Sequence, residues 1–297
     1  MKVEEDRAAT SLGAGPQLTD ERQLALAANR VRQNIVEMLC AAGSGHSGGP
    51  LGMADVFTTL YFGVLNIDPH DPARPDRDRV LLSNGHICPV WYAVLAERGY
   101  FPTSELNTLR QLGTRLQGHT HIGEPPGVEN SSGPLGQGLS QGVGLALAAR
   151  LDKERWRTHV MLSDGEHNEG QIWEAILFAG AHRLANLTAW IDRNYIQIDG
   201  DTEDVLPVGS LAEKYRAFNW HVLEIDGHNH RAIIDAAAHA SAIGDRPTVV
   251  VCHTIPGKGV DFMERDYRWH GIPPNREQAD EALKQLRRQQ VALEEGR

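Results

Sequence analysis

The sequence predicts an α/β fold, a doubly wound parallel sheet flanked by helices, and two observations support this prediction. Short apolar runs alternate with amphipathic segments through the second half of the chain. They predict strands at 158–162, 187–191, 221–225 and 247–253, separated by helices at 172–183, 211–218 and 230–242. In addition, no internal repeat or low-complexity linker divides the 297 residues, so a single domain is expected.

The first half of the chain completes the fold. Apolar residues at helical spacing predict helices at 20–42, 53–65 and 87–98, and a short apolar run predicts a strand at 79–82. The stretch GPLGQGLSQGVGLALAARL, which begins at Gly133, predicts a loop that leads into a helix rich in Gly and Ala. Small residues permit close packing, so we expect this helix to be central. A charged helix with few apolar positions is predicted at 274–297.

Composition and charge exclude several classes of protein. A net charge of −10 with no local cluster of Lys and Arg argues against binding to nucleic acid. No stretch approaches the ~20 consecutive apolar residues that a membrane-spanning helix needs. Cys40, Cys88 and Cys252 are isolated, odd in number and surrounded by apolar residues, which favours buried thiols in a reducing compartment.

The N-terminus lacks the features of an export signal. Residues 1–18 are polar and contain no apolar core followed by a cleavage site, so we expect a cytoplasmic location. We predict that this segment is a tail, either disordered or bound by a partner, and that residues 19–297 form the folded domain.

The most informative stretch carries polar residues at the ends of two predicted strands. Asp164 ends one strand and Asn194 follows the next, so the fold places both at the carboxyl edge of the sheet, where ligands bind. With the backbone carbonyl of Ile196 they form an oxygen-rich set that suits Mg²⁺, a cation that also binds phosphate oxygens. Gly165 permits close approach of a diphosphate, and the helix that begins near Glu169 directs its positive end toward that anion. An isolated Asp-Gly pair is more often a turn, so the prediction depends on the spacing and on the strands.

This stretch and five others resemble the transketolase family. Asp164-Gly165, Glu169-Gly170 and Asn194 resemble the thiamine-diphosphate motif of these enzymes. Further segments resemble transketolase motifs in the same order: GSGHSGGPLG at 43–52, LLSNGH at 81–86, QGH at 117–119, GPLGQGLS at 133–140 and WHG at 269–271. Several unrelated motifs in one order are much more specific than a single glycine pattern. The resemblance covers the chain from about residue 20 to residue 275 and implies a thiamine-diphosphate-binding (PP-type) fold.

The resemblance also implies a role for each matching residue. Mg²⁺ is expected to bind Asp164, Asn194 and the carbonyl of Ile196. Thiamine diphosphate is expected to contact those three residues and also His86, Gly133, Pro134, Leu135, Gly165, Glu169 and His270. His46, His86, His119 and His270 are expected at the reacting carbon, because an imidazole with a pKa near the working pH donates hydrogen bonds and moves protons. A lone His usually has no chemical role, but each of these four lies beside glycine in a matched motif.

The chain length matches one half of a split transketolase. Full-length members of the family place a pyrimidine-binding domain and a C-terminal domain after this one, on a chain more than twice as long. We therefore expect the N-terminal subunit of a two-component enzyme, active only in an α2β2 complex with a partner that carries those two domains. The family transfers a two-carbon ketol unit from a ketose donor to an aldose acceptor, which are commonly sugar phosphates.

Three alternatives remain open. The α subunit of a 2-oxo-acid dehydrogenase shares the metal motif but usually lacks the loops rich in Gly and His. A catalytically silent cofactor-binding or regulatory subunit is the second, and an anion-binding structural protein is the third.

Departures from the family pattern bear on the second of these alternatives. Ser163 stands where transketolases usually have Gly. Ser47 and Thr120 follow His46 and His119 where many members have Pro, so the rigidity of these loops is expected to differ. Pro256 stands where many members have Lys, and Lys258 is a candidate replacement for the lost cation.

Overall fold

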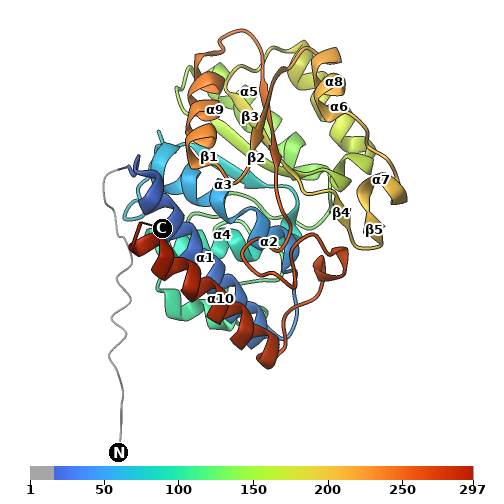
Figure 1. Ribbon diagram of the computed structural model, residues 1–297. Helices are drawn as coiled ribbons and strands as arrows, with labels where there is room; N and C mark the ends of the chain where they lie inside the picture. The colour runs from blue at the N-terminus through green and yellow to red at the C-terminus, as the bar shows by residue number, and fades with distance from the viewer. Residues whose placement is uncertain (1–16, 297) are drawn as a thin grey trace, which may run out of the picture.

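The computed structural model describes residues 17–296, and its centre is a five-stranded sheet in which all neighbouring strands are parallel (Figure 1). The strands of this sheet, in spatial order, are β1 Arg79–Leu82, β2 Thr158–Ser163, β3 Leu187–Arg193, β7 Thr248–His253 and β6 His221–Asp226. All five predicted strands are confirmed. A separate antiparallel hairpin of β4 (Ile196–Gln197) and β5 (Gly200–Asp201) is not predicted by the sequence, because two-residue strands give no periodic signal.

Helices cover both faces of the sheet, as predicted. The helices are α1 Glu21–Ala42, α2 Gly48–Gly52, α3 Ala54–Thr59, α4 Cys88–Arg98, α5 Gln137–Asp152, α6 Gly170–Ala181, α7 Thr202–Val205, α8 Leu211–Ala217, α9 His230–Ala242 and α10 Arg276–Glu294. A π-helical turn, η1 (Leu60–Val64), continues α3, and short 3-10 turns are η2 Gly85–Ile87, η3 Thr103–Thr108, η4 Gly165–Asn168 and η5 Tyr267–Trp269. Residues 1–16 of the predicted tail lie outside the described residues, whereas Leu18 donates its N–H to the carbonyl of Phe62 at 2.7 Å.

Successive strand residues point into two separate cores. Val80, Met161, Trp190, Val250 and Cys252 pack with α1, α3, α4 and α9 on one face. Their neighbours Leu81, Val160, Ala189, Val249 and Val251 pack with α5, α6 and α8 on the other face. A strand that is buried on both sides reads as a continuous apolar run, and the sheet is therefore doubly wound.

The fully buried helices are α2, α3 and α4 and not, as the small residues suggest, α5. Every residue of α4 is buried. The glycines of α5 do permit close packing, since a Cβ on Gly142 would lie 2.3 Å from Cγ2 of Val160 in β2. However, Gly144 and Leu151 on the opposite side of α5 are exposed. The expectation of close packing is confirmed and the expectation of a central position is wrong, because only one face of α5 meets the rest of the chain.

The C-terminal helix α10 lies along α1, and Figure 1 shows the two side by side. Its buried residues, Ala279, Ala282, Leu283 and Leu286, are all apolar, whereas Val291 near its end is exposed. Among residues 17–296, no helix is both long enough and apolar enough to cross a membrane. Cys88 and Cys252 are buried thiols, as predicted, whereas Cys40 is half-buried, and all three cysteines are free.

Candidate active site

Loops at the carboxyl edge of the sheet enclose a cavity of about 280 Å³, which we call the histidine pocket. Its lining consists of His46, His86, His119, Gly133, Leu135, Ser163, Gly165, Glu166, Asn194, Ile196, Gln197, Ile198 and His270. Nine of these residues are predicted site residues, and all four predicted histidines are among them. Segments distant in sequence meet here because β1, β2, β3 and β7 all end at the same edge.

Three of the histidines are in mutual ring contact. The ring centroids of His46 and His86 are 5.0 Å apart, those of His46 and His270 are 5.5 Å apart, and those of His86 and His270 are 5.3 Å apart. Burial lowers the pKa of His46 to about 4, with a further contribution from the nearby His270. Burial also lowers the pKa values of His86, His119 and His270.

These imidazoles are therefore neutral at pH 7, and each offers one hydrogen-bond donor and one acceptor. Within the described part of the chain, the buried Nδ1 atoms of His46 and His270 have no hydrogen-bond partner. Unpartnered buried nitrogens are costly in a folded protein. Their position in the pocket fits a polar ligand such as a sugar, whose hydroxyl groups both donate and accept.

The predicted metal ligand Asp164 lies directly after β2. Its Oδ1 accepts the N–H of Gly165 at 2.7 Å, and its Oδ2 accepts the N–H of Tyr195 at 2.7 Å and Nη1 of Arg193 at 3.1 Å. An ionised carboxylate has about four acceptor positions, so one remains for a cation. The charge of Arg193 is shared with Glu203, whose Oε1 lies 2.6 Å from Nη2.

The amide of Asn194 is held by a buried carboxylate. Its Nδ2 donates to Oδ2 of Asp192 at 2.7 Å, and this bond fixes which end of the amide is the oxygen. Asp192 also accepts the hydroxyl of Thr254, and burial raises the pKa of Asp192 to about 7. Asn194 and Ile196 both line the pocket, and the β4–β5 hairpin places them there.

The lining leaves space and polar groups for a cofactor. A Cβ on Gly133, whose φ is +143°, would meet no atom within 4 Å, and one on Gly165 would come no closer than 3.6 Å to Gln197. The amide of Asn84, just after β1, is fully buried, and in residues 17–296 neither of its polar atoms has a hydrogen-bond partner.

In residues 17–296 no three His, Cys, Asp or Glu side chains are arranged to bind a metal ion. The proposed set has a different composition: one carboxylate, one amide and one carbonyl, which fits a Mg²⁺ ion that keeps other positions for diphosphate and water.

Comparisons with known proteins agree with this geometry. Residues 23–291 match the family described as transketolase, thiamine diphosphate binding domain. The chain belongs to the transketolase family. It is 42% identical to 6-deoxy-6-sulfo-D-fructose transketolase subunit SqwG of Clostridium sp. (strain MSTE9), over 88% of this chain and 95% of that subunit. It is 39% identical to an apulose-4-phosphate transketolase subunit of Phocaeicola vulgatus, over 89% of this chain and 93% of that subunit.

Solved structures give the same family and show the difference in size. The transketolase of Campylobacter jejuni superposes with a TM-score of 0.84 at 29% identity, covering 93% of this chain but 46% of that one. A transketolase chain of this kind is thus about twice as long, whereas the relatives named as subunits have nearly the length of this chain. The chain therefore corresponds to the N-terminal, thiamine-diphosphate-binding subunit of a two-component transketolase, and the predicted fold class and family are confirmed.

Three predicted cofactor residues, Pro134, Asp164 and Glu169, are not among the residues that line the histidine pocket. Pro134 and Glu169 are exposed in the single chain, on segments that adjoin the pocket. Their segments lie close together, because a Cβ on Gly136 would be 3.0 Å from Cβ of Glu169. Asp164, in contrast, is buried behind the lining. Contact of Pro134 and Glu169 with the cofactor stays a prediction, and it depends on a partner that covers this edge.

Hydroxyl groups replace two prolines of the transketolase pattern. The hydroxyl of Ser47 donates to the carbonyl of Ile272 at 2.7 Å and so links the loops that carry His46 and His270. The hydroxyl of Thr120 lies 2.9 Å from the carbonyl of Asn130 and 2.7 Å from Oγ of Ser132. Many transketolases have proline at these two positions, and its ring restrains the backbone. Here hydrogen bonds of the two hydroxyl groups restrain the loops instead.

The other two departures lie beside the pocket. Ser163 lines it, and its backbone carbonyl is 2.8 Å from Nδ1 of the buried His167. Pro256 is buried, and its Cβ lies 3.6 Å from the position that a Cβ on Gly48 would take. Lys258 is half-buried and does not line the pocket, so its position does not support the replacement of a lost cation.

Glu166 is a pocket residue that the sequence does not single out. Its Oε1 accepts the N–H of Gly136 at 2.7 Å and the hydroxyl of Ser83, and its Oε2 accepts the N–H of Ser163 at 3.2 Å. One buried carboxylate therefore ties together the ends of β1 and β2 and the loop that precedes α5. Burial raises its pKa to about 7. Glu166 does stand in the stretch SDGEHNEG, but the sequence alone does not distinguish a carboxylate so close to Asp164 from the metal motif.

We expect Glu166→Ala to destabilise the chain, because three buried donors lose their acceptor and each such loss costs about 1–3 kcal/mol. The free energy of unfolding, measured with urea at pH 8, should fall by ~2 kcal/mol or more. Glu154→Ala, which removes an exposed carboxylate after α5, is the control and should change it little. Equal stability of the two variants would show that Glu166 does not hold these segments together.

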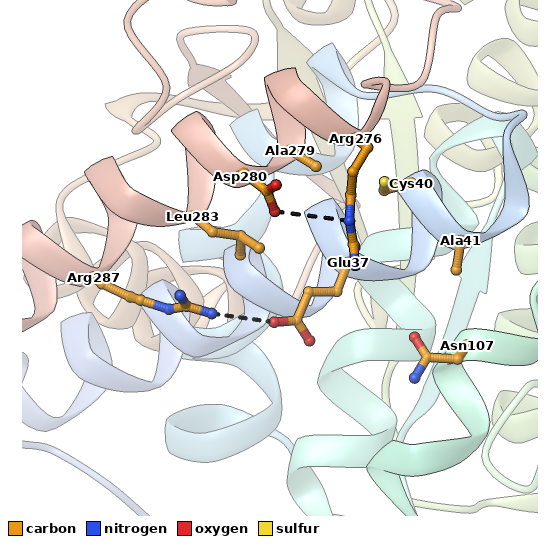
Figure 2. Close-up of a pocket in the computed structure, with 9 residues that line it drawn as sticks. All are labelled: Glu37, Cys40, Ala41, Asn107, Arg276, Ala279, Asp280, Leu283 and Arg287. Atoms are coloured by element: carbon orange, nitrogen blue, oxygen red, sulfur yellow. Dashed lines mark ion pairs between the residues drawn. The ribbon is translucent and has the colours of Figure 1, made fainter.

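A larger cavity, of about 860 Å³, lies elsewhere (Figure 2). It is a groove between α1 and α10, lined by Glu37, Cys40, Ala41, Asn107, Arg276, Ala279, Asp280, Leu283 and Arg287. Its charges pair loosely, with 3.7 Å between Arg287 and Glu37 and 3.9 Å between Arg276 and Asp280. None of the predicted site residues lies in it, so size does not identify the site here.

Proposed function

We propose that this chain is the cofactor-binding subunit of a two-component transketolase that transfers a two-carbon ketol unit from a ketose to an aldose. The observation that carries the proposal is the histidine pocket, in which four neutral imidazoles meet the Asp164, Asn194 and Ile196 edge of the sheet. Thiamine diphosphate, when bound, supplies the electron sink for cleavage and formation of the carbon–carbon bond.

The residues of this chain bind, orient and move protons. Asp164, Asn194 and the Ile196 carbonyl are proposed to hold Mg²⁺, and Gly165 leaves room for the diphosphate. His86, Gly133, Pro134, Leu135, Glu169 and His270 are the proposed further contacts of the cofactor. His46, His86, His119 and His270 are proposed to donate hydrogen bonds to the sugar hydroxyls and to shuttle the proton that bond cleavage releases.

The partner is proposed to carry the pyrimidine-binding and C-terminal domains, in an α2β2 complex. An exposed apolar face supports this: Leu151 on α5 and Leu177 and Phe178 on α6 have 72%, 56% and 40% of their surface exposed. A shallow depression between these two helices continues the face. Apolar patches of this kind on single chains mark protein interfaces.

The relatives named after particular sugars suggest which substrates to test. One is named for 6-deoxy-6-sulfo-D-fructose and another for apulose 4-phosphate, and both names describe sugars with an anionic end. We propose a ketose of that class as donor. The histidine set also separates this proposal from the α subunit of a 2-oxo-acid dehydrogenase, since a 2-oxo acid presents no row of hydroxyl groups to four imidazoles.

The decisive experiment measures ketol transfer by the chain alone, by the product of the neighbouring gene alone, and by their mixture, with thiamine diphosphate and Mg²⁺. The donors are xylulose 5-phosphate, 6-deoxy-6-sulfofructose and apulose 4-phosphate, and the acceptors are ribose 5-phosphate and glyceraldehyde 3-phosphate. We expect activity in the mixture only, and the same mixture should elute as an α2β2 complex. A complex that binds the cofactor but transfers nothing from any donor would support the alternative of a catalytically silent chain.

A further inference from the structure

The loops that carry His46 and His119 are joined by an arginine outside the pocket lining. Arg110 follows η3, and its backbone is left-handed, with a φ of +60°. Its N–H donates to the carbonyl of Leu116 at 2.8 Å, which closes a tight loop over residues 110–116. This geometry turns the side chain back over the segment that leads to His119.

The guanidinium of Arg110 contacts both loops at once. Its Nη1 lies 3.5 Å from Oγ of Ser44, and its Nη2 lies 3.4 Å from the carbonyl of Gly118. It rests on the Cα of Gly118, because a Cβ there would lie 2.8 Å from Nε and 3.0 Å from Cζ. Ser44 and Gly118 are two residues and one residue before His46 and His119, respectively.

The segment under the guanidinium is anchored from the core. The hydroxyl of Tyr92 donates to the carbonyl of Gln117 at 3.0 Å, and the thiol of Cys88 donates to the carbonyl of Gly118 at 3.2 Å. Both side chains come from the buried helix α4. The His119 loop is thus held by α4 and by Arg110, and only Arg110 links it to the His46 loop among these contacts.

We propose that Arg110 is a positioning residue that joins the His46 loop to the His119 loop and fixes where the two imidazoles stand in the histidine pocket. The role rests on the proposed function. Burial is the main cause of the lowered pKa of both rings, and the charge of Arg110 lowers each pKa further. For His119 this charge comes second after burial, and for His46 it comes third, after burial and His270. Arg110, His86 and His270 are the charged or titratable groups that face the rings of His46 and His119. These two rings also face one another.

Three variants of the full chain separate geometry from charge. Arg110→Met removes the contacts and the charge. Arg110→Lys keeps the charge but loses the planar fork that reaches both loops. Gly118→Ala keeps the arginine but displaces its guanidinium, and the fold should survive because the displaced atoms are the end of a flexible side chain.

The first readout is NMR titration of the histidine rings, which needs neither partner nor turnover. In Arg110→Met the titration midpoints of His46 and His119 should rise, because removal of a nearby positive charge favours the protonated ring. In Arg110→Lys, which keeps the charge, the two midpoints should stay close to the wild-type values. Unchanged midpoints in Arg110→Met would overturn the placement of the guanidinium beside these rings.

The second readout is steady-state kinetics of the complex with the partner. All three variants should lower kcat by about 10-fold or more with KM for the sugar changed less, since misplaced imidazoles affect proton transfer more than binding. An increase in KM for an anionic donor at constant kcat would overturn the proposal and assign Arg110 to direct substrate binding. If the wild-type complex transfers no ketol unit, the proposed function fails, and the NMR titration still decides the position of Arg110.

Discussion

Asp164→Ala should abolish Mg²⁺-dependent binding of thiamine diphosphate by the assembled enzyme. The loss in affinity is expected to exceed ~100-fold, because even residues that only support a metal ligand contribute about 10–100-fold. The structure adds a reason of its own: this one carboxylate accepts from Gly165, Tyr195 and Arg193, so its removal also releases the segment that carries Asn194 and Ile196. Binding is measured by calorimetry, with and without a chelator.

Two further variants make the result specific. Asn194→Ala removes a second proposed ligand and should give a similar loss without removing the acceptor of Arg193. Asp204→Ala, which removes an exposed carboxylate in the same region of the chain, should bind the cofactor normally. If Asp164→Ala or Asn194→Ala keeps normal Mg²⁺-dependent binding, the proposed metal site is wrong, whatever the activity of the complex.

The largest expected loss of stability is at Asp55, a buried carboxylate in α3. It forms two hydrogen bonds with the guanidinium of Arg32 and lies 2.7 Å from Nδ1 of His228. Nε2 of His228 accepts the N–H of Ile255 at 2.8 Å, so the ring proton is on Nδ1 and is donated to Asp55. This network supports the 255–257 loop, where Gly257 donates its N–H to the carbonyl of Gly48 at 2.9 Å.

Asp55→Asn should lower the free energy of unfolding at pH 7 by about 3–5 kcal/mol, because it leaves the buried Arg32 without its counter-charge. The double variant Arg32→Met with Asp55→Asn should recover part of that loss, since no unpaired charge remains. Asp235→Asn, which changes an exposed ion pair on α9, is the control and should cost less than ~1 kcal/mol. A single variant as stable as the control would contradict the network.

The contribution of Asp55 should depend on pH in a defined direction. The nearby Arg32 and the hydrogen bond from His228 more than offset burial and hold the pKa of Asp55 far below its ordinary value of 3.8. A depressed carboxyl pKa stabilises the fold fully above the unfolded-state value, and this stabilisation is lost as the pH falls toward the folded-state value. The difference in stability between wild type and Asp55→Asn should therefore be constant from about pH 6 to pH 8 and shrink below about pH 4. A difference that grows on acidification would show that the pair does not stabilise the charged form.

The sequence alone determined the class of the fold and the family. Strand residues that are buried on both sides, such as Val160 and Val250, form continuous apolar runs, so the parallel sheet and its alternating helices could be predicted to within a few residues. The short motifs that carry His46, His86, His119 and His270 are local in sequence. The pair of Asp164 and Asn194 could be predicted because each residue follows a strand of the predicted parallel sheet. These features sufficed to predict a ligand site at the carboxyl edge of the sheet.

Only the tertiary structure decided which residues support that site and which surfaces stay open. The burial of α4 in place of α5 depends on which faces meet, and composition does not report that. The contacts of Glu166 and Arg110 are made to carbonyls, hydroxyls, N–H groups and a glycine of other segments, and such contacts leave no pattern in the chain. The exposure of Pro134 and Glu169 likewise follows from packing. Sequence periodicity records burial along one element, whereas hydrogen bonds between elements exist only once the strands have brought their ends together.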